Sequence, residues 1–304
     1  MKSQLQRINK NKLLSALKKA LFSCVVLLGI VFIFPLITLA EDINIETGSA
    51  LDYSDFKEYK GVLGVGLVGI RLDTKIKITN KNDGFSIGID PENNLDMPES
   101  KQANLFYGRY RLGRKSTIGG SYFSIQRSST LYAPEIILGD VVILEGYAEL
   151  DDKTRFYFFD YSHSFYQDDR SEVKYIFGIS GLDLKYALKA EGQITIGDET
   201  TVSELEEDVS VFAPLPLFGM DVEFALTPKW ALSTRLLLIA GKYEDITAGI
   251  IEARTYAAYS LSKRFGIIFG HYSFGADVSI NNKKENQEID YSYSGIYGGL
   301  HFMF

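Results

Sequence analysis

Two side chains near the end of the chain have the types and spacing that acyl hydrolysis uses. His271 and Ser273 lie two residues apart in "HYS", so on a β-strand both point to the same side. A histidine can accept the proton of a serine hydroxyl, but it also needs an orienting group and donors for the oxyanion. Asp277, the nearest carboxylate downstream, lies roughly 20 Å along a strand. The pair therefore lacks the remaining parts of a catalytic site.

The spacing resembles the His-x-Ser motif of outer-membrane phospholipase and of lipid A deacylase. In those enzymes an asparagine follows the serine, whereas Phe274 follows Ser273 here. Their active sites face the lipid, whereas the alternation described below assigns His271 to the inner face. A lipid- or lipopolysaccharide-modifying hydrolase using His271 and Ser273 is thus an alternative interpretation. The other histidines, His163 and His301, are scattered, so we expect no metal site and no cofactor.

The first forty residues predict export. Six basic residues and no acidic one precede Leu21, and residues 21–40 are uncharged and almost wholly apolar up to the small-residue end "TLA". This pattern is typical of a secretory signal peptide over 1–40, although an apolar run of about 20 residues could also stay as a membrane anchor. Cys24, the only cysteine, lies in this run, which excludes disulfide, metal-thiolate and cysteine-nucleophile sites in the mature chain.

Charge excludes a further class of partner. Removing the six basic residues of 1–40 leaves 26 Lys and Arg against 39 Asp and Glu, a net charge of −13. A nucleic-acid partner is therefore not expected. We assign 41–60 to a polar N-terminal segment in the periplasm and 61–304 to the folded body of the protein.

Alternation of apolar and polar residues, with many Tyr, Phe and Gly, predicts strands throughout this body. Short polar breaks ("GRKS", "QDDR", "TPK", "SKR") alternate with longer ones, among them the acidic "GDETTVSELEED" from Gly197. This layout is typical of an antiparallel up-and-down transmembrane β-barrel with short periplasmic turns and long outer loops. We predict ten strands, near 61–79, 101–112, 117–127, 147–166, 171–190, 209–226, 230–242, 247–260, 264–280 and 289–304. Eight or twelve remain possible, because 131–146 could form another hairpin.

Most strands carry one apolar and one charged face, which in a membrane barrel would face the lipid and the lumen. In a soluble barrel the apolar face would point inward, and sequence alone does not distinguish the two. The charged side chains expected in the lumen are Arg109, Arg111, Asp183, Lys185, Asp221, Glu223, Arg235, Glu252 and Arg254. They predict either a selective channel or, because ten strands leave little free space, an ion-pair network that fills the barrel.

The chain ends in "YGGLHFMF", in which Tyr297, Gly299, Phe302 and Phe304 match the C-terminal β-signal of bacterial outer-membrane proteins. The resemblance implies recognition by the barrel assembly machinery. In such a barrel the last strand closes against the first, so that no backbone polar group is unpaired in lipid. Phe302 and Phe304 would then face outward, with Phe304 in the interfacial aromatic belt.

Four stretches resemble a large family of proteobacterial outer-membrane β-barrel proteins: "YRLGRKSTIGGSYFSIQRSS", "FDYSHSFYQDDRSEV", "APLPLFGMDVEFALTPKW" and "YSYSGIYGGLHFMF". His163 and Ser164 interrupt the family's "YSF", and Ile296 replaces a proline. The resemblance implies the architecture but no reaction. The sequence therefore predicts a monomeric outer-membrane barrel of a Gram-negative bacterium, in contact with lipid and lipopolysaccharide. Its expected role is non-enzymatic: structural, surface-interacting or that of a narrow pore. The alternatives are the hydrolase and a small-solute channel.

Overall fold

The computed structural model describes residues 59–82, 84–196 and 199–304. The predicted signal peptide and nearly all of the predicted N-terminal segment lie outside this part of the chain. In the described residues the order of elements is β1 (Gly61–Asn80), β2 (Ser86–Ile89), α2 (Pro91–Asn94), β3 (Ser100–Arg111), β4 (Ser116–Leu138), β5 (Val141–Gln167), β6 (Ser171–Ile196), β7 (Glu199–Ala225), β8 (Trp230–Tyr243), β9 (Ile246–Ser260), β10 (Phe265–Asn281) and β11 (Glu285–Met303). Across these residues, none of the helical structure has the length and apolarity to span a bilayer.

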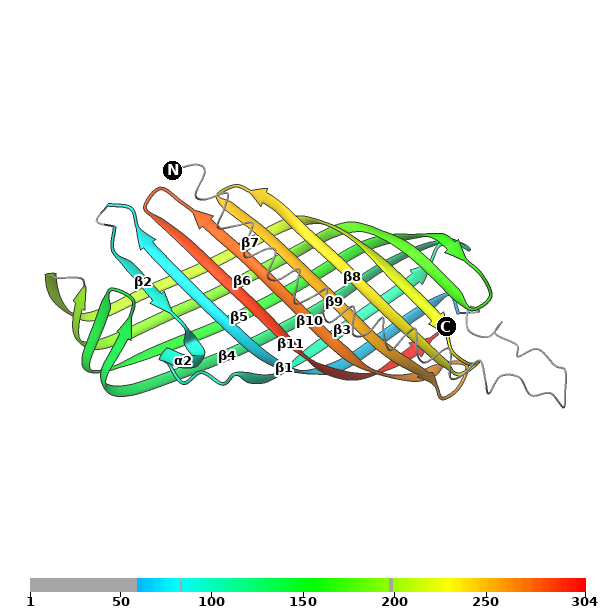
Figure 1. Cartoon of the computed structure of the whole chain (residues 1–304), viewed down its shortest axis with the longest axis horizontal. Coiled ribbons are helices and arrows are strands. Elements are labelled where there is room, and N and C mark those ends of the chain that lie inside the picture. The colour runs from blue at the N-terminus through cyan, green and yellow to red at the C-terminus, as the bar shows by residue number, and fades with distance from the viewer. Residues whose placement is uncertain (1–58, 83, 197–198) are drawn as a thin grey trace.

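The strands form one antiparallel sheet that closes into a barrel (Figure 1). Except for β3, which pairs with β1 and not with β2, each strand pairs with its neighbour in sequence. β11 pairs with β1 from Val62↔Met303 to Asn80↔Glu285. The backbone groups of Phe304 and Gly61 bond to each other at the foot of this seam. The closure predicted from the terminal strand is therefore confirmed.

The strand number also agrees with the sequence. β2 and β3 both pair with β1, at Ile76–Thr79 and at Gly61–Arg71 respectively, so they share one place in the ring. The described strands thus fill ten positions. Residues 131–146 form no extra hairpin, because β4 and β5 run through them to a tight turn at Gly139. This glycine has φ +69°, which favours a residue without a Cβ.

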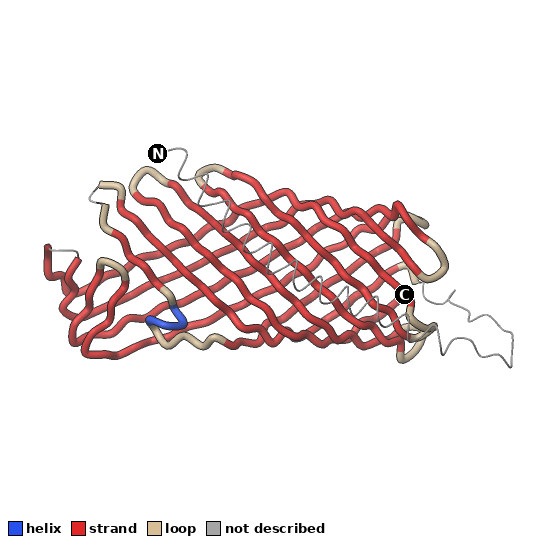
Figure 2. The backbone as a smooth tube through the Cα atoms, in the orientation of Figure 1, coloured by secondary structure: helices blue, strands red, loops and turns tan. Residues whose placement is uncertain are grey.

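The connections predicted as long loops and those predicted as short turns lie at opposite ends of the barrel (Figure 2), although most of the predicted long loops are strand that ends in a tight turn. We call the end with the short turns, Tyr59 and Phe304 the short-turn end, and the other the long-loop end. β4, β5, β6 and β7 have 23 to 27 residues and extend beyond the rest. Pairing of β7 with β8 stops at Leu217, immediately after Pro216, which has no backbone N–H to donate.

The polarity of the two barrel faces inverts along the strands. In the first part of β10, Phe265, Ile267 and Phe269 point outward, and Phe269 is 64 % exposed. Five residues later Phe274 points inward and is 4 % exposed. The predicted outward position of the apolar residues Tyr272 to Ile280 is therefore wrong for this half of the strand. They form an apolar core inside the long-loop half instead.

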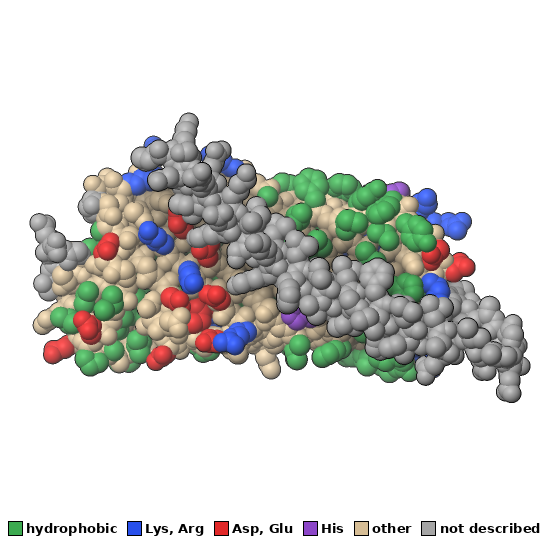
Figure 3. All heavy atoms as spheres, viewed as in Figure 1, with side chains coloured by type: hydrophobic (Ala, Val, Ile, Leu, Met, Phe, Trp, Pro, Cys, Tyr) green, Lys and Arg blue, Asp and Glu red, His purple; other side chains and the backbone are tan. Residues whose placement is uncertain are grey.

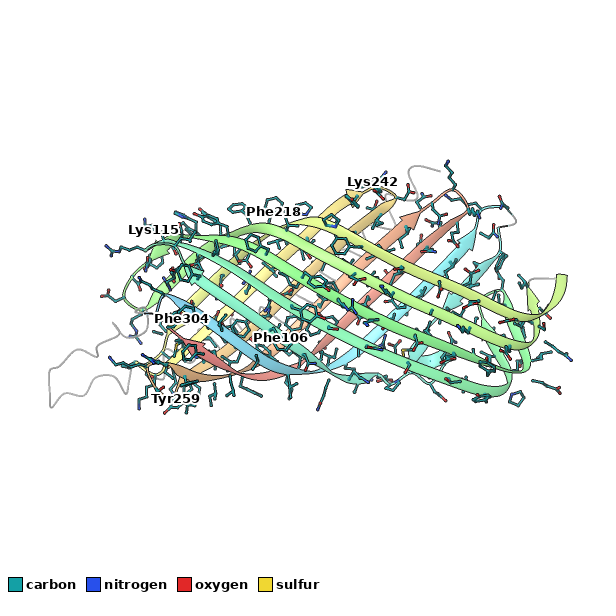
Figure 4. The ribbon with its side chains drawn as sticks, turned by 180° about the vertical axis from the view of Figure 1, so that it is seen from behind. Phe106, Lys115, Phe218, Lys242, Tyr259 and Phe304 are labelled. Atoms are coloured by element: carbon teal, nitrogen blue, oxygen red, sulfur yellow. The ribbon has the colours of Figure 1, made fainter. Side chains whose placement is uncertain are left out.

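The same inversion divides the whole barrel into two zones. On β1 the outward residues are Leu63, Val65 and Leu67 near the short-turn end, but they are charged from Arg71 onward. Large outward apolar side chains gather toward the short-turn end (Figure 3), where Phe218 points away from the wall and Lys115 marks the rim (Figure 4). On β1 the apolar band covers 61–70, and a tilted membrane-spanning strand needs about 9–11 residues.

Candidate functional site: the filled interior of the barrel

An aromatic layer crosses the interior midway along the barrel. Phe156 on β5 and Phe274 on β10 lie five strand positions apart in the ring, yet their ring centroids are 4.5 Å apart. Tyr293 on β11 stacks on Phe274 at 4.7 Å and on Phe123 of β4 at 5.2 Å. These side chains are at most 4 % exposed. Because the contacts run from wall to wall, the layer fills the cross-section at this height.

Below this layer, ion pairs join strands across the interior. Arg109 on β3 lies 3.2 Å from Asp221 on β7, and Arg235 on β8 lies 2.5 Å from Asp160 on β5. Nearer the short-turn end, Glu172 accepts from Arg111 at 2.9 Å and lies 3.0 Å from Lys174. Lys174 and Glu172 lie on the same strand. The other three pairs each join two strands that are not neighbours in the sheet. The charges therefore link the walls of the barrel.

Arg254 lies at the top of the charged zone, directly beneath the aromatic layer. Arg254 bonds to Glu252 on its own strand, and its guanidinium lies 5.4 Å from the ring centre of Tyr272. Glu252 is 1 % exposed and its Oε2 has no hydrogen-bond partner among the described residues. The contact with the Tyr272 ring joins the ionic zone to the aromatic zone by a cation–π interaction.

A second ionic site lies above the aromatic layer and was not predicted from the sequence. Arg127, fully buried on β4, donates to Asp152 at 2.8 and 3.0 Å and to Thr74 at 2.8 Å. It also donates to Glu92 of α2, whose other oxygen accepts the backbone N–H of Thr74 at 3.2 Å. Thr74 lies between the part of β1 that pairs with β3, which ends at Arg71, and the part that pairs with β2, which begins at Ile76. Glu92 thus closes the gap in the interrupted strand.

Seven of the nine charged residues predicted to face the lumen do so. Asp183 and Lys185 do not, and that prediction is wrong for them. The inward residues of β6 are even-numbered, such as Lys174 and Leu182, so the odd-numbered pair lies on the outer wall. Asp183 pairs there with Arg155 of β5 at 3.1 Å. Asp221 and Arg235 occupy paired positions, as expected, although the printed sequence gave no sign that Asp160 would bind Arg235.

The hydrolase candidates lie on the outer wall, so the assignment of His271 to the lumen is wrong. The inversion explains the error: Tyr272 and Phe274 point inward, which turns His271 and Ser273 outward. His271 pairs with Ile296 and Thr255, and Ser273 with Ser294 and Ala253. Among the described residues no side-chain hydrogen bond joins the two. The structure therefore brings them to one face without assembling a base, an orienting group and an oxyanion site.

The residues of the C-terminal motif lie at the closing seam. Tyr297 points inward and is 2 % exposed, whereas Phe304 is 51 % exposed. Phe302 lies 5.2 Å from Phe265 and 6.0 Å from Phe304, which makes a small cluster of rings on the outer rim. Gly299 pairs with Gly66 of β1. This placement agrees with the predicted orientation, and recognition by assembly machinery stays a prediction.

At the long-loop end, outside the apolar band, carboxylates approach one another. Burial raises the pKa of Glu207 on β7, and the nearby carboxylates of Glu285 and Asp208 raise it further. Glu285 begins β11, so this group joins two strands across the mouth. The described residues hold no cluster of histidine, cysteine and carboxylate side chains arranged to bind a metal ion.

Comparisons with known proteins give similarity at the level of barrels only. No protein-family model matches the chain, and no curated protein matches its sequence. Among solved structures, the outer membrane protease OmpT from Escherichia coli shares 9 % identity at a TM-score of 0.44, over 80 % of this chain and 96 % of that one. The Pseudomonas putida toluene transporter TodX shares 12 % at 0.32, over 86 % and 93 %. Ail, the attachment invasion locus protein of Yersinia pestis, shares 9 % at 0.27, over 81 % and 99 %. These TM-scores are too low to transfer an activity, so the architecture rests on the strand pairing itself.

Proposed function

We propose that the chain is a monomeric outer-membrane protein of a Gram-negative bacterium, with its short-turn end toward the periplasm. The observation that carries the proposal is the inversion of polarity along the strands. Apolar side chains point outward over about ten residues per strand near the short-turn end, which suits a bilayer. Beyond that band the outer wall is polar, and the apolar side chains fill the interior. A barrel soluble over its whole length would gain nothing from the outward band.

The proposed role is non-enzymatic: a structural or surface-interacting barrel that projects a rigid extension from the membrane. The interior supports this reading, because wall-to-wall aromatic and ionic contacts leave no continuous passage along the barrel axis. The same layer argues against the small-solute channel. His271 and Ser273 face outward, as the active sites of the similar lipid-modifying enzymes do, but no orienting group bonds to them among the described residues, which argues against the hydrolase. Lipid and lipopolysaccharide are the partners of the apolar band in this proposal, and the assembly machinery acts during biogenesis.

Two measurements test the proposal. Folded membrane barrels migrate faster in gels before boiling than after it, so the purified protein is expected to show heat-modifiable mobility. Planar bilayers containing the protein are expected to show no current steps. A single mobility would count against the membrane barrel, and regular steps of defined conductance would establish a channel instead. Wild-type protein heated and refolded in micelles serves as the control for reversible mobility.

A further inference from the structure

The barrel interior opens at the short-turn end into a cavity of about 770 Å³. Its upper boundary is formed by Arg109 and Tyr107 of β3 and Tyr256 of β9, and its rim by turn residues. The aromatic layer lies above, so the cavity leads nowhere. A cavity of this size falls within the roughly 300–1,000 Å³ of small-molecule sites.

Cations dominate the lining. Seven Lys or Arg side chains border the cavity against one acidic side chain, that of Glu223. The deep ones are already paired: Arg109 with Asp221, Arg111 with Glu172, and Lys174 with both Glu172 and Glu223. These deep pairs fix the shape of the inner end of the cavity. Their charges are largely balanced, so they add little net positive potential.

The rim supplies the unbalanced charge. Lys60 precedes β1, Lys229 belongs to the turn before β8, and Arg264 to the turn before β10. In the part of the chain that the structure describes, none of these three has a carboxylate within ion-pair distance. Three cations brought to one opening by separate segments, in a chain of net charge −7, mark a site for negative charge.

The walls add groups suited to a polar ligand. Tyr59, Tyr107 and Tyr256 present rings and hydroxyls to the cavity. His301 on β11 also lines it, with its Nε2 buried over the backbone of Gly266 on β10. The three tyrosines and the rim cations therefore border the same cavity.

From this arrangement we infer that the cavity binds a small polyanionic solute carrying phosphate or carboxylate groups. Lys and Arg recognise both groups through charge-assisted hydrogen bonds. The solute enters from the short-turn end and leaves by the same route, so the site binds and does not conduct. The inference depends on the proposed function only for its compartment, the periplasm.

Calorimetric titration of the purified chain in uncharged maltoside micelles tests the inference. Pyrophosphate and citrate serve as probes, and sucrose as the neutral control, at low ionic strength because salt screens the rim charges. Both anions are expected to bind, and sucrose is not. The variant Lys60→Gln/Lys229→Gln/Arg264→Gln is expected to weaken binding at least about tenfold, given the size of three exposed charge contacts. The control Arg114→Gln/Lys115→Gln removes two positive charges at a turn outside the cavity, and is expected to bind nearly as wild type.

Two outcomes would overturn the inference: equal affinity of wild type and the rim variant, or an equal loss of affinity in the control variant. Heat-modifiable mobility of each variant separates misfolding from loss of the site. A barrel that passes this mobility test but binds neither anion refutes the inference and leaves the proposed function standing.

Discussion

Phe156 and Phe274 touch across the barrel from opposite walls, with ring centroids 4.5 Å apart. Their contact belongs to no strand pair, so it forms only once the sheet has closed. It joins the β4–β7 extension to the side of the barrel that contains β10 and β11. The stability of the closed barrel should therefore depend on this layer more than on any single outward side chain.

Truncating the layer is the first test. Phe274→Ala is expected to lower the free energy of unfolding by about 3–5 kcal/mol, because it removes a buried ring and leaves a cavity. Phe269→Ala, five residues away on the outer wall, is expected to cost clearly less in micelles. Urea unfolding followed by the fluorescence of Trp230, the only tryptophan, measures both. Equal losses would contradict the inward placement of Phe274.

The sequence predicted the ring of strands well where the alternation was clean. Strands expected at 230–242 and 247–260 are found at Trp230–Tyr243 and Ile246–Ser260. The extensions were missed: β4 was expected to end near 127 but continues to Leu138, and β7 begins at Glu199 within the expected acidic loop. Their outer faces carry many polar side chains, although Tyr132 and Ile137 are exposed on β4, so the sequence pattern assigned them to loops.

The inversion of polarity was also missed, although the sequence of β10 contains it. Phe265, Ile267 and Phe269 are odd-numbered, whereas Tyr272 and Phe274 are even-numbered. Because the apolar positions change phase within one strand, they cannot be read as one apolar face. In the proposed membrane orientation, this change marks the level at which the barrel leaves the bilayer. Asp152 lies opposite Arg127 on the neighbouring strand. The bonds of Arg127 to Glu92 and Thr74, and that of Arg235 to Asp160, could not be predicted, because they depend on which elements face each other inside the closed ring.

Arg127 provides the second prediction. Arg127→Met leaves Asp152 and Glu92 as buried carboxylates without their cation, and is expected to cost about 3–5 kcal/mol of stability. The matched control is Arg155→Met, on β5 three residues after Asp152. Arg155 pairs with Asp183 on the outer wall, where its side chain is 28 % exposed, so the expected cost is about 0–1 kcal/mol.

Proteolysis gives an independent readout of this site. Because Glu92 attaches α2 to β1 through the N–H of Thr74, Arg127→Met should also speed cleavage within 90–99 under native conditions. Arg155→Met should leave that rate unchanged. A variant of Arg127 as stable and as protease-resistant as wild type would show that the buried pairs do not hold α2.

The third prediction concerns pH. Burial and neighbouring carboxylates raise the pKa of Glu207, so the folded chain binds its proton more tightly than the unfolded chain does. The resulting stabilisation is present below the ordinary glutamate pKa of about 4.3 and is lost as pH rises through the folded value. Glu207→Gln is therefore expected to stabilise the protein at pH 7 and to give no gain at about pH 3. Unfolding curves of wild type and Glu207→Gln at the two pH values test this prediction. An equal gain in the free energy of unfolding at both pH values would show that the raised pKa of Glu207 is not the cause.

The last prediction concerns the outward pair, His271 and Ser273. Ser273 lies beside Ser294 and Ala253 on the outer wall, and the described residues place no hydrogen-bonded base next to its hydroxyl. Ser273→Ala is therefore expected to leave phospholipid and lipid A turnover equal to that of wild type, both at background. The matched variant Ser292→Ala, also on the outer wall, controls for effects of altering a wall hydroxyl. If wild type hydrolysed either lipid and Ser273→Ala alone abolished it, the exposed pair would be catalytic and the non-enzymatic proposal would fail.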